Sequence, residues 1–274
     1  MFWNAKNGTV SIDNAEISYV SFGYGNKALI ILLGLSDGII TVKGKALLLA
    51  KPYKIFFEKY TVYIFSRRKN LPEEYSIKEM ADDQAKAMQK LGIKKASVMG
   101  VSQGGMIAQH LAVDHAEMIE KLVLAVSAPR ANKMIQTNIS KWIEFANQGN
   151  HKQLMIDVIE KNYSPKYLAK YRKLYPVIGM IGKPSNYKRF LTNANAILQF
   201  DILHDLKNIT CPTLIVGGEE DRVVGIQSSC EMNEQIAGSE LYVYAGLGHA
   251  AFQEAKDFTK RVFDFLEPTL ETTL

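Results

Sequence analysis

The chain has 274 residues, of which 47% are hydrophobic and 22% are charged, and its formal net charge is +5. This composition is ordinary for a soluble globular protein, and the length suits one large α/β domain or a domain that carries an insertion. No apolar run approaches the roughly 20 residues of a membrane span, the first residues lack the order of a secretory signal, and no segment resembles a nucleic-acid module. We therefore expect a cytoplasmic protein with neither a membrane nor a nucleic-acid partner.

Cysteines and basic residues add little to this expectation. Cys211 and Cys230 have no metal-type spacing, which favours free thiols in a reducing compartment. The positive charge is spread along the sequence in short clusters such as Arg67-Arg68-Lys69. Such a cluster is typical of a solvated loop, and a site for an anionic partner is the alternative.

The first segment predicts an antiparallel hairpin. Apolar and polar residues alternate over Thr9 to Ile12 and Glu16 to Ser21, on either side of the turn residues Asp13-Asn14.

A different pattern follows the hairpin. Short, nearly continuous apolar runs alternate with helical patterns such as Ser76 to Leu91, where Ser76-Ile77-Lys78-Glu79 forms a capping box. Strands that are apolar on both faces indicate a parallel sheet covered by helices on both sides. The predicted strands are Ala28–Leu33, Val62–Phe65, Ala96–Met99, Leu122–Val126, Thr213–Val216 and Leu241–Tyr244.

The most informative residue is Ser102, in Gly100-Val101-Ser102-Gln103-Gly104-Gly105. It stands directly after the third of these strands and before a helical pattern. Small residues two positions before and after the serine allow a sharp strand-to-helix turn, which exposes the hydroxyl and directs the Gln103 N–H toward a developing oxyanion. The motif alone is weak, and its context makes Ser102 a candidate nucleophile.

The interval from Ala131 to Phe200 lacks a convincing strand. Helical patterns cover Ile139–Gln148, Lys152–Glu160 and Tyr187–Gln199. About 70 residues is long for one connection, so we expect a helical lid over residues 131–200, inserted into a core of residues 1–130 and 201–274. An ordinary pair of crossover helices is the alternative.

A serine nucleophile needs a base and an acid that orients the base. Among the five histidines, His249 is the candidate base, because two glycines flank it in the loop after the last strand. His110, His115, His151 and His204 are expected to be surface or packing histidines.

Three acids follow the strand Thr213–Val216: Glu219, Glu220 and Asp221. Asp221 is the preferred candidate, because Val223-Val224 can anchor its loop to the domain, whereas the two glutamates are expected to be solvated. The order Ser102, Asp221, His249 is that of a nucleophile-elbow sheet.

Three segments in this order resemble the α/β-hydrolase superfamily, in particular its lid-bearing single-domain serine hydrolases. They are Tyr75 to Ala108, Ile209 to Asp221, and Gly248-His249-Ala250-Ala251-Phe252 with Val262 to Leu266. The resemblance implies the α/β-hydrolase fold: a mostly parallel central sheet flanked by helices, with an N-terminal hairpin and a helical lid.

The resemblance also locates an oxyanion loop at Leu33-Gly34-Leu35-Ser36, where the Leu35 N–H would pair with that of Gln103. The chain departs from the family at two places. Leu33 stands where a histidine usually precedes the glycine, and Ser66-Arg67-Arg68-Lys69-Asn70 replaces an acid-then-Arg-Gly loop.

The expected function is that of a serine hydrolase, carboxylesterase-like, which cleaves an ester or related small-molecule acyl compound through an acyl-enzyme on Ser102. A slowly turning-over ligand sensor and an acyltransferase on the same triad are the alternatives. Ester, lactone, thioester, amide and carbon–carbon bonds all stay open, as does the oligomeric state, and no metal or organic cofactor is implied. Candidate acyl-pocket residues, which could equally form the lid core, are Met134, Trp142, Phe145, Met155 and Met180.

Overall fold

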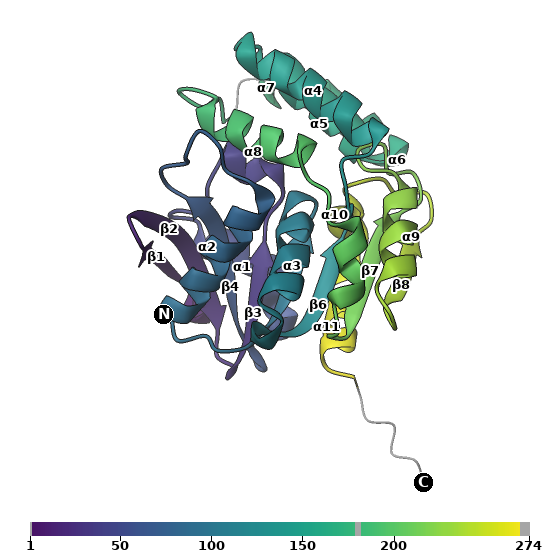
Figure 1. The fold of residues 1–274 in the computed structure, drawn as a ribbon. Coiled ribbons are helices and arrows are strands. Elements are labelled where there is room, and N and C mark those ends of the chain that lie inside the picture. Colours follow the sequence, from purple (N-terminus) through teal and green to yellow (C-terminus); the bar gives the residue numbers. More distant parts are fainter. Residues whose placement is uncertain (1, 179–181, 269–274) are drawn as a thin grey trace.

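An eight-stranded sheet in the order β1-β2-β4-β3-β5-β6-β7-β8 runs through the computed structural model, which describes residues 2–178 and 182–268 (Figure 1). The strands are β1 Lys6–Ile12, β2 Ala15–Gly23, β3 Lys27–Leu32, β4 Tyr60–Arg68, β5 Ala96–Val101, β6 Ile119–Ala125, β7 Thr213–Gly218 and β8 Glu240–Tyr244.

The sheet has an antiparallel beginning and a parallel remainder. β1 and β2 form the predicted hairpin, with Ile12 opposite Ala15, and β2 pairs antiparallel with β4. All other neighbouring strands are parallel. On β3, Leu29 and Ile31 enter one buried cluster while Ile30 and Leu32 enter the other, so the strand is apolar on both faces. The predicted parallel sheet and hairpin are confirmed.

Helices cover both faces of the sheet. α2 (Ile77–Lys90), α3 (Gln103–Asp114) and α9 (Ile226–Gln235) bury their apolar residues in one cluster, and α1 (Ala46–Ala50) and α11 (Phe258–Leu266) bury theirs in the other. The predicted capping box of α2 is present, since Glu79 N donates to Ser76 Oγ (3.2 Å) and Ser76 N to the Glu79 carboxylate (2.8 Å). The short elements are η1 Phe2–Asn4, η2 Leu35–Gly38, η3 Lys51–Phe56, η4 Ala116–Met118, η6 Leu203–Asn208 and α10 Ala251–Glu254.

A helical segment connects β6 to β7 and lies across one edge of the sheet (Figure 1). Its two ends meet, because Ala131 N donates to Phe200 O and Ile202 N to Pro129 O, both at 2.9 Å. We call residues 131–200 the cap segment; that it acts as a lid stays a prediction. Its elements are α4 Lys133–Asn147, α5 His151–Asn162, α6 Pro165–Tyr171, η5 Arg172–Leu174, α7 Tyr175–Ile178 and α8 Lys188–Leu198.

None of the helices in the described ranges combines the length and the apolar character needed to cross a membrane.

Candidate active site

Ser102 occupies a strained turn between β5 and α3. Its φ of 54° and ψ of −121° lie outside the conformations that a residue with a Cβ prefers. The turn also requires glycine at position 104, where an added Cβ would lie 2.0 Å from the carbonyl oxygen of Leu32. Because β5 is parallel to its neighbours, this turn places Ser102 at the carboxyl edge of the sheet. The loops after β3, β7 and β8 begin at the same edge.

His249 lies between Ser102 and Asp221. The Ser102 Oγ is 3.0 Å from His249 Nε2, and Nδ1 of the same ring is 2.8 Å from Asp221 Oδ2. An ionised carboxylate only accepts hydrogen bonds, so the Asp221 contact places a proton on Nδ1 and leaves Nε2 free to accept from the serine hydroxyl. The structure thus brings the three residues of the expected triad into one hydrogen-bonded chain.

Asp221 is buried and well supplied with donors. Its Oδ1 accepts the backbone N–H groups of Val223 (2.8 Å) and Val224 (3.0 Å). Burial by itself would raise the pKa of Asp221, but attraction to His249, the hydrogen bond from that ring and the two backbone donors outweigh it, and the pKa is lowered. The carboxylate is therefore charged at neutral pH.

The two rival acids lie elsewhere. Glu219 is exposed and its Oε2 accepts from Gly246 N (2.9 Å), while Glu220 is exposed at the surface. Gly218 permits the close approach of the acid and histidine loops, because an added Cβ there would lie 2.2 Å from Gly248 O.

The loop after β3 lies against Ser102. A Cβ built on Gly34 would lie 3.2 Å from the Ser102 Cβ and 3.7 Å from its Oγ. Leu35 is the first residue of η2 and Gln103 is the first residue of α3. Backbone N–H groups in the first turn of a helix have no partner within that helix. The N–H groups of Leu35 and Gln103 are therefore not used by their own helices, as the expected oxyanion donors require.

Asp37, in the same η2 turn, is fully buried and was not predicted from the sequence. Its carboxylate accepts from Ser66 Oγ (2.6 Å), Arg67 N (3.0 Å) and the Arg189 guanidinium (2.7 Å). Arg189, on α8 of the cap segment, also donates to the carbonyl oxygens of Asp37, Arg67 and Arg68. The loop after β3 is therefore bound to the cap segment through an ion pair whose carboxylate is fully buried and whose guanidinium is partly buried.

Arg67 extends these contacts to the nucleophile turn. It is 2% exposed, and its Nη2 donates to Leu33 O (2.6 Å) and to the side-chain oxygen of Gln103 (3.0 Å). The Gln103 amide in turn donates to Asn193 O on α8 (2.7 Å). Burial lowers the pKa of Arg67, against the opposing effect of Asp37. Two guanidinium groups and one carboxylate leave a net positive charge beside the expected oxyanion site.

The prediction of a solvated loop at Arg67-Arg68-Lys69 is wrong for both arginines. Arg67 is buried as described, and the Arg68 Nε donates to the Asp83 carboxylate at 2.6 Å. Only Lys69 is largely exposed. Burial of Arg67 follows from its place at the end of a central strand.

Two other helices of the cap segment contact the acid and histidine loops. On α4, the Asn138 side-chain N–H donates to Arg222 O (2.8 Å) and Val223 O (3.1 Å). At the end of α5, Asn162 O accepts from Ala250 N, next to His249 (2.8 Å). Each of the loops that carry Leu35, Asp221 and His249 thus has a hydrogen bond to a helix of the cap segment.

The expected acyl-pocket residues are dispersed over the cap segment. Trp142 is 4% exposed, belongs to the apolar core, and donates from Nε1 to Asp157 (2.8 Å). Phe145 and Met155 are half-buried, and Met134 is 43% exposed beside Gly225. Met180 lies outside the described residues. The role of all five in substrate binding stays a prediction.

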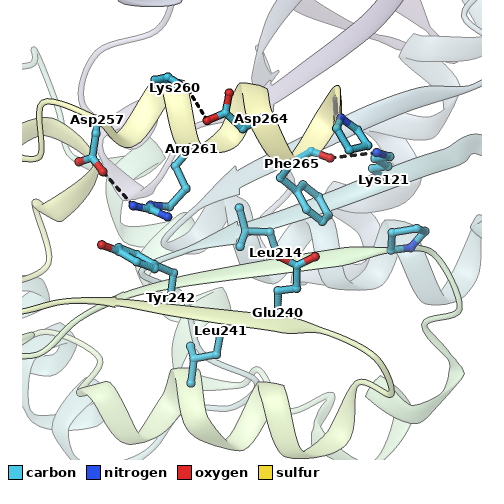
Figure 2. A pocket seen from close by; sticks show the side chains of 12 residues that line it. Lys121, Leu214, Glu240, Leu241, Tyr242, Asp257, Lys260, Arg261, Asp264 and Phe265 are labelled. Atoms are coloured by element: carbon cyan, nitrogen blue, oxygen red, sulfur yellow. Dashed lines mark hydrogen bonds and ion pairs between the residues drawn. The ribbon is translucent and has the colours of Figure 1, made fainter. Parts of the chain in front are cut away.

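Figure 2 shows the residues that line a cavity of about 680 Å³, and Ser102, Asp221 and His249 are not among them. α11 and the strands β7 and β8 form it, with Lys121 and Glu240 near the amino ends of their strands, opposite the edge that carries Ser102. The Arg261 guanidinium lies 3.4 Å from the ring centroid of Tyr242 and pairs with Asp257. Within residues 2–178 and 182–268, the cavity included, no group of three or more His, Cys, Asp or Glu side chains is arranged to hold a metal ion.

The comparisons with known proteins agree with the observed fold. A model of the alpha/beta hydrolase fold matches residues 63–256, and the chain belongs to this family. It is 28% identical over 186 residues to a 2-hydroxy-6-oxononadienedioate/2-hydroxy-6-oxononatrienedioate hydrolase of a Pseudomonas species, a match that spans 65% of each chain. It is 23% identical over 203 residues to the pimeloyl-(acyl-carrier protein) methyl ester esterase of Vibrio cholerae, covering 66% of this chain and 74% of the esterase.

Among solved structures, the alpha/beta hydrolase MGS-M2 from a Medee basin deep-sea metagenome library superposes with a TM-score of 0.86. It is 21% identical, and the match covers 97% of this chain and 100% of that one. The relatives by sequence are hydrolases, and hydrolase activity is the class of chemistry that they support.

Proposed function

We propose that the chain is a serine hydrolase that cleaves a carboxylic ester or a related acyl compound through an acyl-enzyme on Ser102. One observation carries the proposal: the unbroken hydrogen-bonded chain from Ser102 Oγ through both His249 nitrogens to Asp221. A structural hydroxyl needs no buried imidazole and carboxylate in line with it, whereas a nucleophilic hydroxyl does.

In the proposed first step, Ser102 Oγ attacks the acyl carbon while His249 Nε2 takes the hydroxyl proton. Asp221 stabilises the imidazolium that forms, and its lowered pKa keeps it ionised for this role. The backbone N–H groups of Leu35 and Gln103 stabilise the oxyanion, and each such donor contributes about 3 kcal/mol in similar sites. His249 then gives its proton to the leaving group.

In the second step, His249 removes a proton from water, and the resulting hydroxide attacks the acyl-enzyme. Collapse of the intermediate releases the acid and returns the proton to Ser102. Arg67 and Arg189 carry two positive charges and Asp37 carries one negative charge, so this group is positive overall. Its positive charge favours both anionic intermediates.

The experiment is turnover of aryl esters of increasing acyl length, combined with the mass of any trapped adduct. We expect multiple turnover that is lost in Ser102→Ala and kept in Ser11→Ala, a serine that is exposed on β1. Unchanged activity in Ser102→Ala would refute the proposal. A single-turnover burst with a persistent Ser102 adduct would assign a sensor instead, and product partition toward an added alcohol would assign an acyltransferase.

A further inference from the structure

One short segment carries most of the excess positive charge of the chain. Residues 43–59 contain a single acid, Glu58, in a chain whose formal net charge is +5. The five lysines of the segment are Lys43, Lys45, Lys51, Lys54 and Lys59. The expectation that charge is spread along the sequence is therefore wrong at this place.

The same segment exposes large apolar side chains. α1 is followed at once by η3, and Ala46 and Ala50 form the buried side of this helical stretch. On its outer side, Leu47 is 57%, Leu48 is 73% and Ile55 is 40% exposed. Removing leucine and isoleucine side chains from water lowers the free energy of the system. A group of them on the outer side of a helix therefore indicates an interaction surface.

The amino-terminal turn adds aromatic rings to this surface. η1 packs against α1, and its Phe2 is 69% exposed. The Lys54 ammonium lies 4.3 Å from the centroid of the Trp3 ring. Aromatic rings beside lysines are common where a protein meets the head groups of a bilayer. We call the surface formed by Phe2, Lys43, Lys45, Leu47, Leu48, Lys51, Lys54 and Ile55 the α1 surface.

Among the residues that the structure describes, the lysines of the α1 surface have no acidic partner. Across residues 2–178 and 182–268, the lysines that pair with a carboxylate lie at other positions: 27, 69, 78, 86, 141, 161 and 260. The charge of the α1 surface is thus uncompensated. A second copy would present charge of the same sign, which opposes self-association through this face.

We propose that the α1 surface binds the surface of an anionic lipid bilayer, which replaces the expectation from the sequence that no membrane is a partner. The lysines would contact lipid phosphates, and Leu47 and Leu48 would enter the boundary between head groups and acyl chains. An acidic protein surface would complement the lysines but would place Leu48 against charged groups, which is unfavourable for an apolar side chain. The proposal concerns attachment to a bilayer surface and is independent of the reaction at Ser102.

The test is sedimentation of the full chain with vesicles of phosphatidylcholine alone or with about one third phosphatidylglycerol. We expect binding to the mixed vesicles only, and weaker binding as salt is added. Changing Lys43, Lys45, Lys51 and Lys54 together to Gln should lower the partition coefficient about fivefold per lysine. Leu47→Ser with Leu48→Ser should lower it about tenfold or more.

Two matched controls separate this surface from net charge and from exposed leucine in general. The first changes four exposed lysines elsewhere to Gln and removes the same charge: Lys94, Lys95, Lys166 and Lys170. The second is Leu174→Ser, which is 49% exposed on the cap segment. Both should bind mixed vesicles like the wild type.

Three results would overturn the proposal. They are a wild type that does not bind mixed vesicles at low salt, control variants that lose as much binding as the α1 variants, and self-association that disappears in Leu47→Ser with Leu48→Ser. Thermal melts of every variant establish that the loss of binding is not a loss of folding.

Discussion

The proposed nucleophile and the loops beside it are positioned in two different ways. Ser102 is held by the sheet and its own turn: its N–H donates to Ala125 O at 2.9 Å, and Gly104 lets α3 approach the end of β3. The loops that carry Leu35, Asp221 and His249 depend in addition on contacts from α8, α4 and α5. Short-range backbone geometry defines the first, and side chains from a distant segment define the second.

This difference assigns a positioning role to the cap segment. A lid that only excludes water needs an apolar inner face, but this segment makes hydrogen bonds to each of these three loops. We therefore expect changes in its inner polar residues to affect kcat, and changes on its outer surface to leave kcat unaltered.

Loss of the base should have the largest effect. His249→Ala removes the proton acceptor of Ser102, and we expect kcat for an aryl ester to fall by about 10⁴-fold or more. His204→Ala, an exposed histidine, should leave kcat unchanged. Steady-state kinetics measure both, and comparable losses in the two variants would contradict the assigned base.

A larger residue at position 104, in the turn after Ser102, should lower the stability of the folded chain. In Gly104→Ala the new Cβ would overlap Leu32 O, and we expect the free energy of unfolding to fall by about 3 kcal/mol. Gly44→Ala is the control, because Gly44 has a φ of 78° but nothing within 4 Å of an added Cβ; strain alone costs about 1 kcal/mol. Denaturant unfolding compares them, and equal losses would show that close packing at the elbow is unimportant.

The ion pair between α8 and the oxyanion loop should act on kcat. In Arg189→Met, Asp37 loses its cap-segment partner, and we expect kcat to fall about 10- to 100-fold with little change in KM, because a misplaced oxyanion donor affects the transition state most. Arg189→Lys should restore part of the loss. Arg172→Met, an exposed arginine of the same segment, is the control. A rise in KM at constant kcat would indicate a substrate contact instead.

A smaller effect is expected at the acid loop. Asn138→Ala removes two hydrogen bonds to the backbone of Arg222 and Val223, each worth about 1 kcal/mol. We expect kcat to fall several-fold, and the exposed Asn147→Ala to change nothing. If Asn138→Ala alters only the melting temperature, the cap segment stabilises this loop without positioning it for catalysis.

The pH dependence of stability should be the smallest effect. The pKa of Asp221 is lowered in the folded chain, so its ionised form stabilises that state. This contribution is present above the ordinary aspartate pKa near 4 and is lost as pH falls through the lowered folded value. The difference in melting temperature between wild type and Asp221→Asn should therefore be largest at neutral pH and disappear in acid. A difference that grows in acid would contradict this sign.

The sequence predicts the features that depend on short-range patterns and does not predict those that depend on distant contacts. The hairpin, the parallel strands and the α2 capping box are short-range patterns, and the structure confirms them. The glycines around Ser102 also predict the turn from the sequence, because a tight turn restricts the residue type at neighbouring positions.

Asp37, Arg189 and Asn138 could not be found in this way. Asp37 and Arg189 are 152 residues apart in sequence, and a polar residue carries no local signal of the partner that the fold will bring to it. The burial of Arg67 has no local signal either, because three consecutive basic residues are usually solvated. Its guanidinium is buried by contacts that only the fold creates, with the carbonyl oxygen of Leu33 and the side chain of Gln103.

The φ of 54° at Ser102 has a further consequence for the energetics of the whole chain. A side chain in this conformation costs about 1 to 2 kcal/mol, whereas glycine adopts it freely. Ser102→Gly should therefore melt at a higher temperature than Ser102→Ala, which keeps the Cβ, and above the wild type as well. The backbone strain therefore falls on the residue that the proposed mechanism uses as its nucleophile.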